Sequence, residues 1–138
     1  MKDSVTIQQR ENMSFDVQVN GHKMVLDASG EFGGNNEGPR PKSLMLVALA
    51  GCTGMDVASI LNKMRVEYED LKVIVDGNIT DEHPKHFDSM HIKYIIKGKG
   101  IPEDKVRTAI NLSQDKYCGV SFSLKKAMDI TWELIIEE

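Results

Sequence analysis

The sequence has little cysteine, few aromatic residues and no excess of positive charge. Two cysteines occur among 138 residues, and aromatic residues make up only 6%. Two cysteines are too few for the disulfide framework of a small secreted domain, and the lack of a C-x-x-C pair excludes a thioredoxin-type motif and a two-pair zinc knuckle. The net charge is −4 and no run of Lys or Arg is present, which argues against a nucleic-acid partner.

Long hydrophobic runs are also missing. The longest nearly apolar run, Leu44 to Met55, is interrupted by Asp56 and is shorter than the roughly 20 residues that span a bilayer, so we expect no membrane segment. The first residues, "MKDSVTIQQREN", contain no apolar signal-peptide core, which predicts a cytoplasmic protein. No phosphate-binding loop, dinucleotide fingerprint or Gly-x-Ser-x-Gly motif occurs, and no cofactor is expected.

The remaining pattern is that of one ordinary globular domain over residues 1–138, with 41% hydrophobic and 28% charged residues. Alternation and turn signals predict strands over 4–9, 14–21, 22–28, 70–81, 90–98 and 129–138. Helical periodicity predicts helices over 42–65, 103–117 and 118–128. This order predicts an α+β fold in which an antiparallel sheet packs on a central helix.

The first predicted helix contains "LMLVALAGCTGMDVASIL", which carries Cys52. Its first half is apolar on every side, which predicts full burial, whereas its second half is amphipathic. Cys52 has two interpretations: an inert packing thiol, or a reactive one, since Gly51 and Gly54 leave room for a small ligand. Asp56 shares a helix face with Cys52. It marks either the point where the helix meets solvent or a charge that needs a partner.

The second cysteine, Cys118, lies in "YCGVS" at the start of a short predicted helix. Backbone N–H groups and the helix dipole there would favour a thiolate, and the alternative is that Cys118 fills space beside Tyr117. His83 and His86 have an i, i+3 spacing, but Pro84 between them disfavours a helix, so we expect no metal site.

Two segments resemble the OsmC/Ohr family of osmotically induced and organic-hydroperoxide-resistance proteins, most of all its OsmC-like branch. "GPRPKSLMLVALAGCTGMDVASILNKMRV" resembles the family's Asn-Pro-Glu-x-Leu…Ala-x-Cys pattern. "YCGVSFSLKKA" resembles its Cys-Pro-x-Ser pattern, with Gly119 in place of proline and Ser121 retained. The order of elements fits the family along the whole chain. The resemblance implies an OsmC-like fold, with antiparallel sheets around a long buried central helix, in an intertwined homodimer.

The resemblance also implies thiol-dependent reduction of small hydrophobic peroxides. Cys52 would attack the O–O bond and become a sulfenic acid, and Cys118 would condense with it to a disulfide. An external dithiol, of lipoyl type in the family, would then reduce the pair. The family's active-site arginine comes from the N-terminal strands, and in this sequence it corresponds to Arg10.

The sequence departs from the family pattern where the helix begins. Lys42 replaces the family's glutamate, so the carboxylate that would orient the arginine is missing. Arg40 is a rival for Arg10, and Lys42 could itself supply positive charge near a thiolate. The departures leave two alternatives of the same fold: a protein that binds a small hydrophobic ligand around Cys52, and a dimer whose Cys52–Cys118 oxidation changes its shape without turnover.

Overall fold

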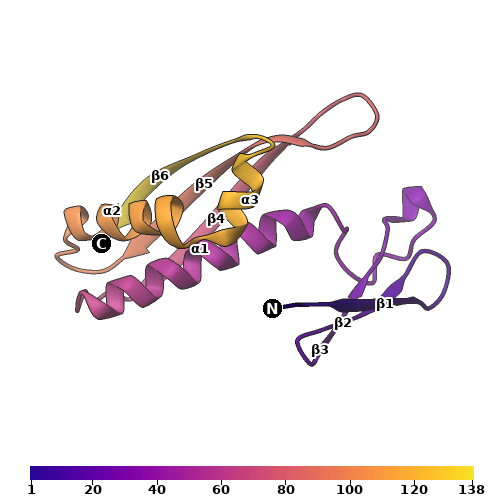
Figure 1. Cartoon of the computed structure of the whole chain (residues 1–138), viewed down its shortest axis with the longest axis horizontal. Coiled ribbons are helices and arrows are strands. Elements are labelled where there is room, and N and C mark those ends of the chain that lie inside the picture. Colours follow the sequence, from indigo (N-terminus) through magenta and orange to yellow (C-terminus); the bar gives the residue numbers. More distant parts are fainter. The chain divides into compact units, whose positions relative to one another are not determined.

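The computed structural model describes residues 1–138 as two compact units, Met1–Met45 and Leu46–Glu138 (Figure 1). The predicted order of strands and helices is confirmed. The single domain over 1–138 stays a prediction. The elements are β1 (Val5–Gln9), β2 (Phe15–Val19), β3 (His22–Leu26), the 3-10 turn η1 (Gly30–Phe32), α1 (Ser43–Lys63), β4 (Asp70–Ile79), β5 (Phe87–Lys97), α2 (Glu103–Leu112), the π-helical turn η2 (Ser113–Tyr117), α3 (Gly119–Lys125) and β6 (Asp129–Glu137).

The first unit is a three-stranded antiparallel meander in the order β1-β2-β3. Val17, at the centre of β2, is opposite Ile7 on one side and Met24 on the other, and it is buried. Asn20 and Gly21 connect β2 to β3, and both have positive φ values, 51° and 78°. This is the backbone that a tight two-residue hairpin needs, and it explains the Asn-Gly sequence.

Asp27 organises the long loop that follows β3. Its buried carboxylate accepts hydrogen bonds from the backbone N–H groups of Ala28, Asn35 and Glu37. Burial alone would raise the pKa of Asp27, but these three bonds and the nearby Arg40 charge outweigh it, so its pKa lies below the usual value. One carboxylate therefore ties both ends of this glycine-rich loop together.

The second unit contains the sheet β4-β5-β6. β4 and β5 are antiparallel, as predicted, but β6 runs parallel to β5, so the expectation of purely antiparallel sheets is wrong for this pair. The reason is the connection: α2, η2 and α3 carry the chain back across the sheet before β6 begins, which is the crossover that a parallel pair requires.

The core of the second unit lies between this sheet and the helices. β5 alternates strictly, and its inward side chains Ile92, Tyr94 and Ile96 are fully buried. Val106 and Ile110 of α2 belong to the same cluster. Each aliphatic side chain that is fully buried in this way contributes about 1.5–3 kcal/mol to stability.

Within the chain, α1 buries one stripe instead of its whole surface. The buried positions recur every four residues, as expected for one face of a helix: Leu49, Thr53, Val57 and Leu61. The prediction that the first half is buried on every side is therefore wrong for the single chain, because its own sheet covers only one face. Val47 and Met55 on the other faces are 62% and 76% exposed.

The same helix is long and apolar enough to cross a membrane by length and composition alone, criteria that core helices of folded domains also meet.

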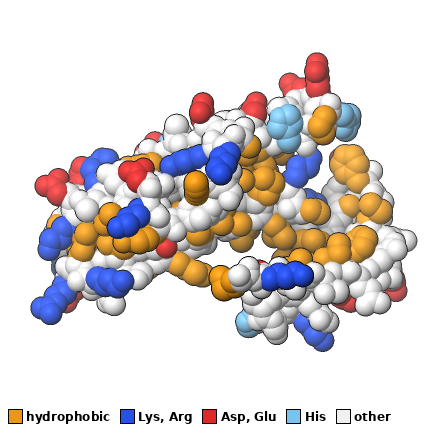
Figure 2. Space-filling view, in the orientation of Figure 1, with side chains coloured by type: hydrophobic (Ala, Val, Ile, Leu, Met, Phe, Trp, Pro, Cys, Tyr) orange, Lys and Arg blue, Asp and Glu red, His pale blue; other side chains and the backbone are white.

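The buried Thr53 hydroxyl of α1 lies 2.6 Å from the Tyr94 hydroxyl of β5, which ties the helix to the sheet. Hydrophobic side chains also reach the surface of both units among charged ones (Figure 2). Exposed apolar surface often marks a place where a protein contacts another molecule.

Candidate functional site

Two cysteines and one carboxylate meet in the second unit. The Sγ atoms of Cys52 and Cys118 and a carboxylate oxygen of Asp56 all lie within 4.8 Å of one another. Cys118 is buried, whereas Cys52 is only partly buried. The folded chain thus brings together the two cysteines that the sequence singled out, and adds Asp56 to them.

Local structure explains how each group reaches this point. Cys52 and Asp56 are four residues apart on α1 and share a face of the helix. The π-helical turn η2 ends at Cys118, which caps the N-terminus of α3. The N–H of Cys118 donates to the Ser113 carbonyl at 2.7 Å, and its Sγ accepts from the Ser121 N–H at 3.3 Å. Wide π turns of this kind often occur at functional sites.

The surroundings of Cys118 keep it protonated. Burial raises its pKa to about 11, and the neighbouring Cys52 and Asp56 act in the same direction. The hydrogen bond from Ser121 lowers the pKa but does not compensate. The expectation that the start of α3 makes Cys118 a thiolate is therefore wrong, because burial, together with Cys52 and Asp56, outweighs the backbone N–H group.

Asp56 combines both interpretations that the sequence left open. It has a partner, since the Ser113 hydroxyl donates to its Oδ2 at 2.9 Å. It also reaches the surface, where it borders a pocket of about 510 Å³ together with Ile60, Lys63 and Tyr117. The carboxylate therefore connects the thiol pair with an opening to solvent.

A buried polar network lies behind the thiols. The hydroxyl of Thr53 is 2.6 Å from Tyr94 and 2.8 Å from Ser113, and the side-chain amide of Gln114 donates to both Thr53 and Tyr94. Ser121 in turn donates to the Gln114 Oε1 at 2.8 Å. No buried side-chain nitrogen or oxygen lacks a partner, so the network is fully satisfied.

Sequence reasoning missed most of this network. Thr53 carried the one usable signal, because it is the single polar residue in the buried stripe of α1. The roles of Tyr94, Ser113 and Gln114 depend on side chains from three different elements, and no local pattern indicates that they meet. The sequence indicates Ser121 only through its place in the segment "YCGVS".

The glycines of α1 and the donor atoms of the site bear on what it could bind. A Cβ added at Gly51 would meet no atom within 4 Å, whereas Gly54 packs against Val73. Because neighbouring residues of a helix point in different directions, the opening at Gly51 is not an opening at the Cys52 thiol. Cys52, Asp56 and Cys118 offer three donor atoms of types that bind Zn²⁺, one fewer than the four of a structural zinc site.

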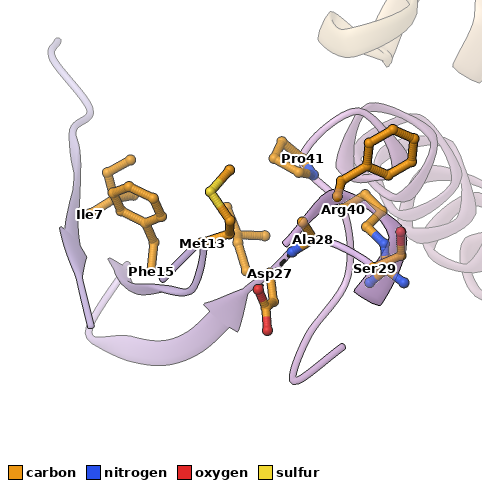
Figure 3. A pocket seen from close by; sticks show the side chains of 10 residues that line it. Ile7, Met13, Phe15, Asp27, Ala28, Ser29, Arg40 and Pro41 are labelled. Carbon is orange, nitrogen blue, oxygen red and sulfur yellow. Dashed lines mark hydrogen bonds between the residues drawn. The ribbon is translucent and has the colours of Figure 1, made fainter. Parts of the chain in front are cut away.

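A second cavity lies wholly within the first unit (Figure 3). It measures about 440 Å³ and is lined mostly by apolar side chains, among them Ile7, Met13, Phe15 and Pro41. It contains neither cysteine. Its walls are typical of a surface that contacts another apolar group.

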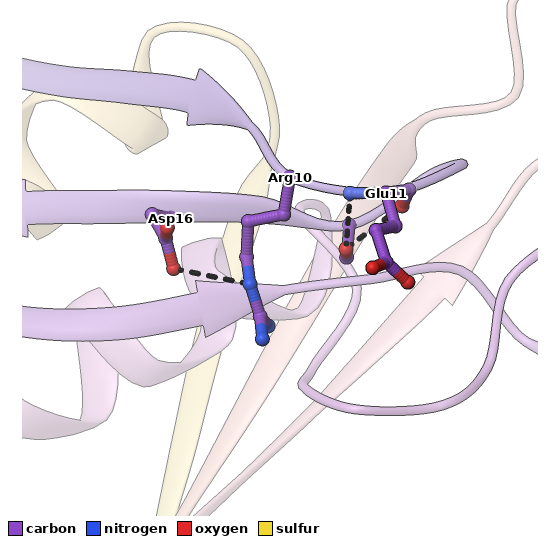
Figure 4. Close-up of polar contacts among 4 residues, drawn as sticks. Arg10, Glu11 and Asp16 are labelled. Atoms are coloured by element: carbon purple, nitrogen blue, oxygen red, sulfur yellow. Dashed lines mark hydrogen bonds and ion pairs between the residues drawn. The ribbon is translucent and has the colours of Figure 1, made fainter.

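The three candidate cations belong to this first unit. Arg10 follows β1, and its Nε lies 3.4 Å from the Asp16 carboxylate (Figure 4). Arg40 donates to the Gly38 carbonyl and to Asn36, each at 2.7 Å. Lys42 is exposed just before α1. That any of them activates a thiol stays a prediction.

A known family and known proteins resemble this chain over most of its length. The family model described as OsmC-like protein matches residues 34–133. Protein YhfA of Escherichia coli strain K12 is 32% identical over 113 residues, which cover 82% of this chain and 81% of that protein. A crystal structure of a hypothetical protein from Aquifex aeolicus VF5 covers 100% of this chain and 99% of its own, with 30% identity and a TM-score of 0.84.

The fold is also shared with a more distant protein. The crystal structure of an organic hydroperoxide resistance protein OsmC from Legionella pneumophila has a TM-score of 0.72 and 15% identity, covering 98% of this chain and 97% of its own. At that identity the likeness concerns the fold alone. The α+β architecture is thus the OsmC-like one, and on the family match and the identity to YhfA the chain belongs to the OsmC family.

Proposed function

We propose that this protein is a thiol-dependent peroxidase that reduces organic hydroperoxides. The observation that carries the proposal is the meeting of Cys52 and Cys118 in one partly open site. Two thiols placed together on different helices can pass reversibly through a sulfenic acid and a disulfide, which is the chemistry that peroxide reduction needs. Membership of a family that includes proteins named for hydroperoxide resistance supports the same reaction class.

Exposure gives the two thiols different roles in this proposal. Cys118 is buried, and burial raises its pKa to about 11, so it keeps its proton at neutral pH. Cys52 is the more exposed thiol, so it is the one that attacks. Its thiolate takes the terminal peroxide oxygen, the O–O bond breaks, and the alkoxide leaves and is protonated to an alcohol. Cys118 then forms the disulfide with release of water, and an external dithiol such as a lipoyl group restores both thiols.

The surroundings favour an organic peroxide as the substrate. The surface pocket at Asp56 has one apolar wall, formed by Ile60, Met64 and Leu112, while Ser59 and Lys63 also line it and neither cysteine does. An apolar wall stabilises an alkyl group but gives no compensation for the desolvation of hydrogen peroxide. We therefore expect a small hydrophobic hydroperoxide to react faster than hydrogen peroxide.

A homodimer in the cytoplasm completes the proposal. The exposed apolar residues of α1, Val47 and Met55, are what a second copy of the chain would cover.

Arg10 is our candidate for the cation that activates Cys52, with Arg40 and Lys42 as rivals. A reducing compartment would keep both thiols available.

The experiment is steady-state turnover of cumene hydroperoxide with dithiothreitol or a lipoyl dithiol as reductant. Repeated turnover that is lost in Cys52→Ser supports the proposal. A Cys52→Ser variant that still reduces alkyl peroxide contradicts it. Oxidation of both thiols once, without a cycle, would instead indicate a redox-responsive dimer.

The cavity of the first unit favours a second candidate function, binding of a small hydrophobic ligand. Its apolar walls and volume of about 440 Å³ suit such a molecule. Native mass spectrometry of freshly purified protein, together with binding of an apolar fluorescent probe, tests this candidate. The absence of both a bound ligand and probe binding would remove it.

A further inference from the structure

The hydroxyl groups of Tyr94, Thr53 and Ser113 each donate a hydrogen bond to the next group on the way to Asp56. Ser113 has a single hydroxyl proton, and it donates that proton to the Asp56 carboxylate. Its contact with Thr53 must therefore be donated by Thr53. The Thr53 proton is then used, so Thr53 accepts from Tyr94 and from the Gln114 amide. Hydrogen bonds aligned in this way strengthen one another.

A second series of hydrogen bonds connects this network to Cys118. The Gln114 Oε1 accepts from the Ser121 hydroxyl, and the Ser121 N–H donates to the Cys118 Sγ. Asp56 and Cys118 are thus opposite ends of one chain of hydrogen bonds that also fixes α1, η2 and α3 relative to one another. Only Oδ2 of Asp56 accepts from Ser113, which leaves the other carboxylate oxygen available to the thiols.

We propose that Asp56 is a catalytic base, which accepts the proton of Cys118 when that thiol attacks oxidised Cys52. The inference rests on the proposed peroxidase function. In this step the Cys118 Sγ forms a bond to the Cys52 Sγ, the S–O bond of the sulfenic acid breaks, and the oxygen leaves as water. The thiol proton passes to Asp56 and a proton returns to the departing hydroxide, so that no net charge is created. The separation of up to 4.8 Å is one that a small movement or a single water closes.

Among the groups that act electrostatically on the Cys118 thiol, Asp56 is the one carboxylate. The acidic groups that act on the Cys118 thiol are Cys52, which is already oxidised at this stage, and Asp56. The Tyr94 hydroxyl has a pKa raised to about 12 and is a proton donor. The Lys125 ammonium donates to the Gln114 carbonyl. A buried thiol of high pKa attacks only if its proton leaves in the same step, and the carboxylate provides the destination.

The test measures disulfide closure directly, without needing a peroxide. Cys52 is first converted to a mixed disulfide with thionitrobenzoate. Attack by Cys118 then forms the Cys52–Cys118 bond and releases the yellow thionitrobenzoate anion, whose absorbance gives the closure rate. We expect Asp56→Asn to slow closure by about 100-fold, within the range for loss of a general base. We expect Asp104→Asn, which changes an exposed carboxylate in the first turn of α2, to leave the rate unchanged.

The pH dependence separates a base from a merely structural residue. Without a base, closure depends on the Cys118 thiolate, and burial still raises the pKa of that thiol, so the rate in Asp56→Asn should rise about tenfold per pH unit above neutral pH. The unaltered protein should show a much shallower rise. If Asp56→Asn does not fold by circular dichroism, Ser113→Ala replaces it. That variant keeps the carboxylate but frees it to turn, and closure should slow about tenfold.

The results also distinguish this inference from the proposed function. Wild-type closure that is equally fast in Asp56→Asn, or no wild-type closure from the mixed disulfide, overturns the role of Asp56. Closure that depends on Asp56, in a protein that no hydroperoxide oxidises, leaves Asp56 as the base and refutes peroxidase activity.

Discussion

The Sγ atom of Cys52 on α1 lies within 4.8 Å of the Sγ atom of Cys118 at the N-cap of α3. Cys118 is buried and its pKa is raised by burial, whereas Cys52 is only partly buried. This difference in exposure fits the proposed peroxidase, in which one thiol meets the substrate and the other then closes the disulfide.

The two cysteines should give different phenotypes when each is replaced by serine. Cys52→Ser removes the attacking sulfur and should abolish turnover of cumene hydroperoxide. Cys118→Ser keeps the attacking sulfur, so it should react once and accumulate a sulfenic acid that dimedone traps. Quenched-flow mass spectrometry distinguishes the two species. Equal loss of the first oxidation step in both variants would contradict the assigned roles.

The acidity of Cys118 predicts slow alkylation. In Cys52→Ser, where Cys118 is the remaining thiol, iodoacetamide should react poorly at pH 8 and about tenfold faster with each pH unit above it. Loss of the Cys52 thiol removes its hydrogen bond and its charge as causes of the high pKa, but burial, the largest cause, remains. Alkylation that already reaches its plateau below pH 9 would show that Cys118 is a thiolate at the helix start.

Thr53 should be important for stability. Thr53→Val keeps the shape of the side chain but removes the acceptor for the Tyr94 hydroxyl and the Gln114 amide. A buried donor left without a partner costs about 1–3 kcal/mol, and we expect the free energy of unfolding in urea to fall by about this amount. Thr108→Val on the exposed face of α2 is the matched control, expected to change it by less than about 0.5 kcal/mol.

Asp27 should make the first unit sensitive to acid. Its pKa is lowered on folding, so its stabilisation is present above the unfolded value of 3.8 and is lost as the pH falls through the lower, folded value. Asp27→Asn should therefore have a lower melting temperature than the wild type at pH 7, with a smaller difference at pH 3. Asp81→Asn, at an exposed loop position, should show neither effect. A difference that is equal at both pH values would contradict this role.

The exposed side of α1 should be an interface between two copies. Met55 is 76% exposed in the single chain, so Met55→Glu should be harmless in a monomer. In a dimer it buries an unpaired charge, and we expect the dimer dissociation constant to rise at least tenfold. Light scattering with size-exclusion chromatography gives the mass of both proteins. A wild-type monomer, or an unaffected dimer in the variant, would place the interface elsewhere or remove it.

Much of the fold could be predicted because its signals are local. Alternating apolar residues, the Asn20-Gly21 turn and the helical periodicity of α1 each depend on a few neighbouring residues, and the order of elements followed from them. The direction of β6 could not be predicted in this way. It depends on how α2 and α3 cross the sheet, which is a property of the whole second unit.

The site was predictable in its cysteines and unpredictable in its electrostatics. Cys52 and Cys118 stood out because they are the only thiols and lie in two recognisable segments. The high pKa of Cys118 depends on burial and on Asp56, neither of which the short sequence "YCGVS" reveals. Ser113 could not be identified either, because its role depends on two partners on α1.

The most direct test of the proposed peroxidase cycle is intact-protein mass spectrometry during repeated additions of cumene hydroperoxide and a dithiol. We predict that one equivalent of peroxide removes two hydrogen atoms from the chain, that peptide mapping places the new bond between Cys52 and Cys118, and that the dithiol restores the original mass over many cycles. Two thiols that stay reduced under excess peroxide would contradict it, and would leave this member of the OsmC family with a use other than peroxide reduction.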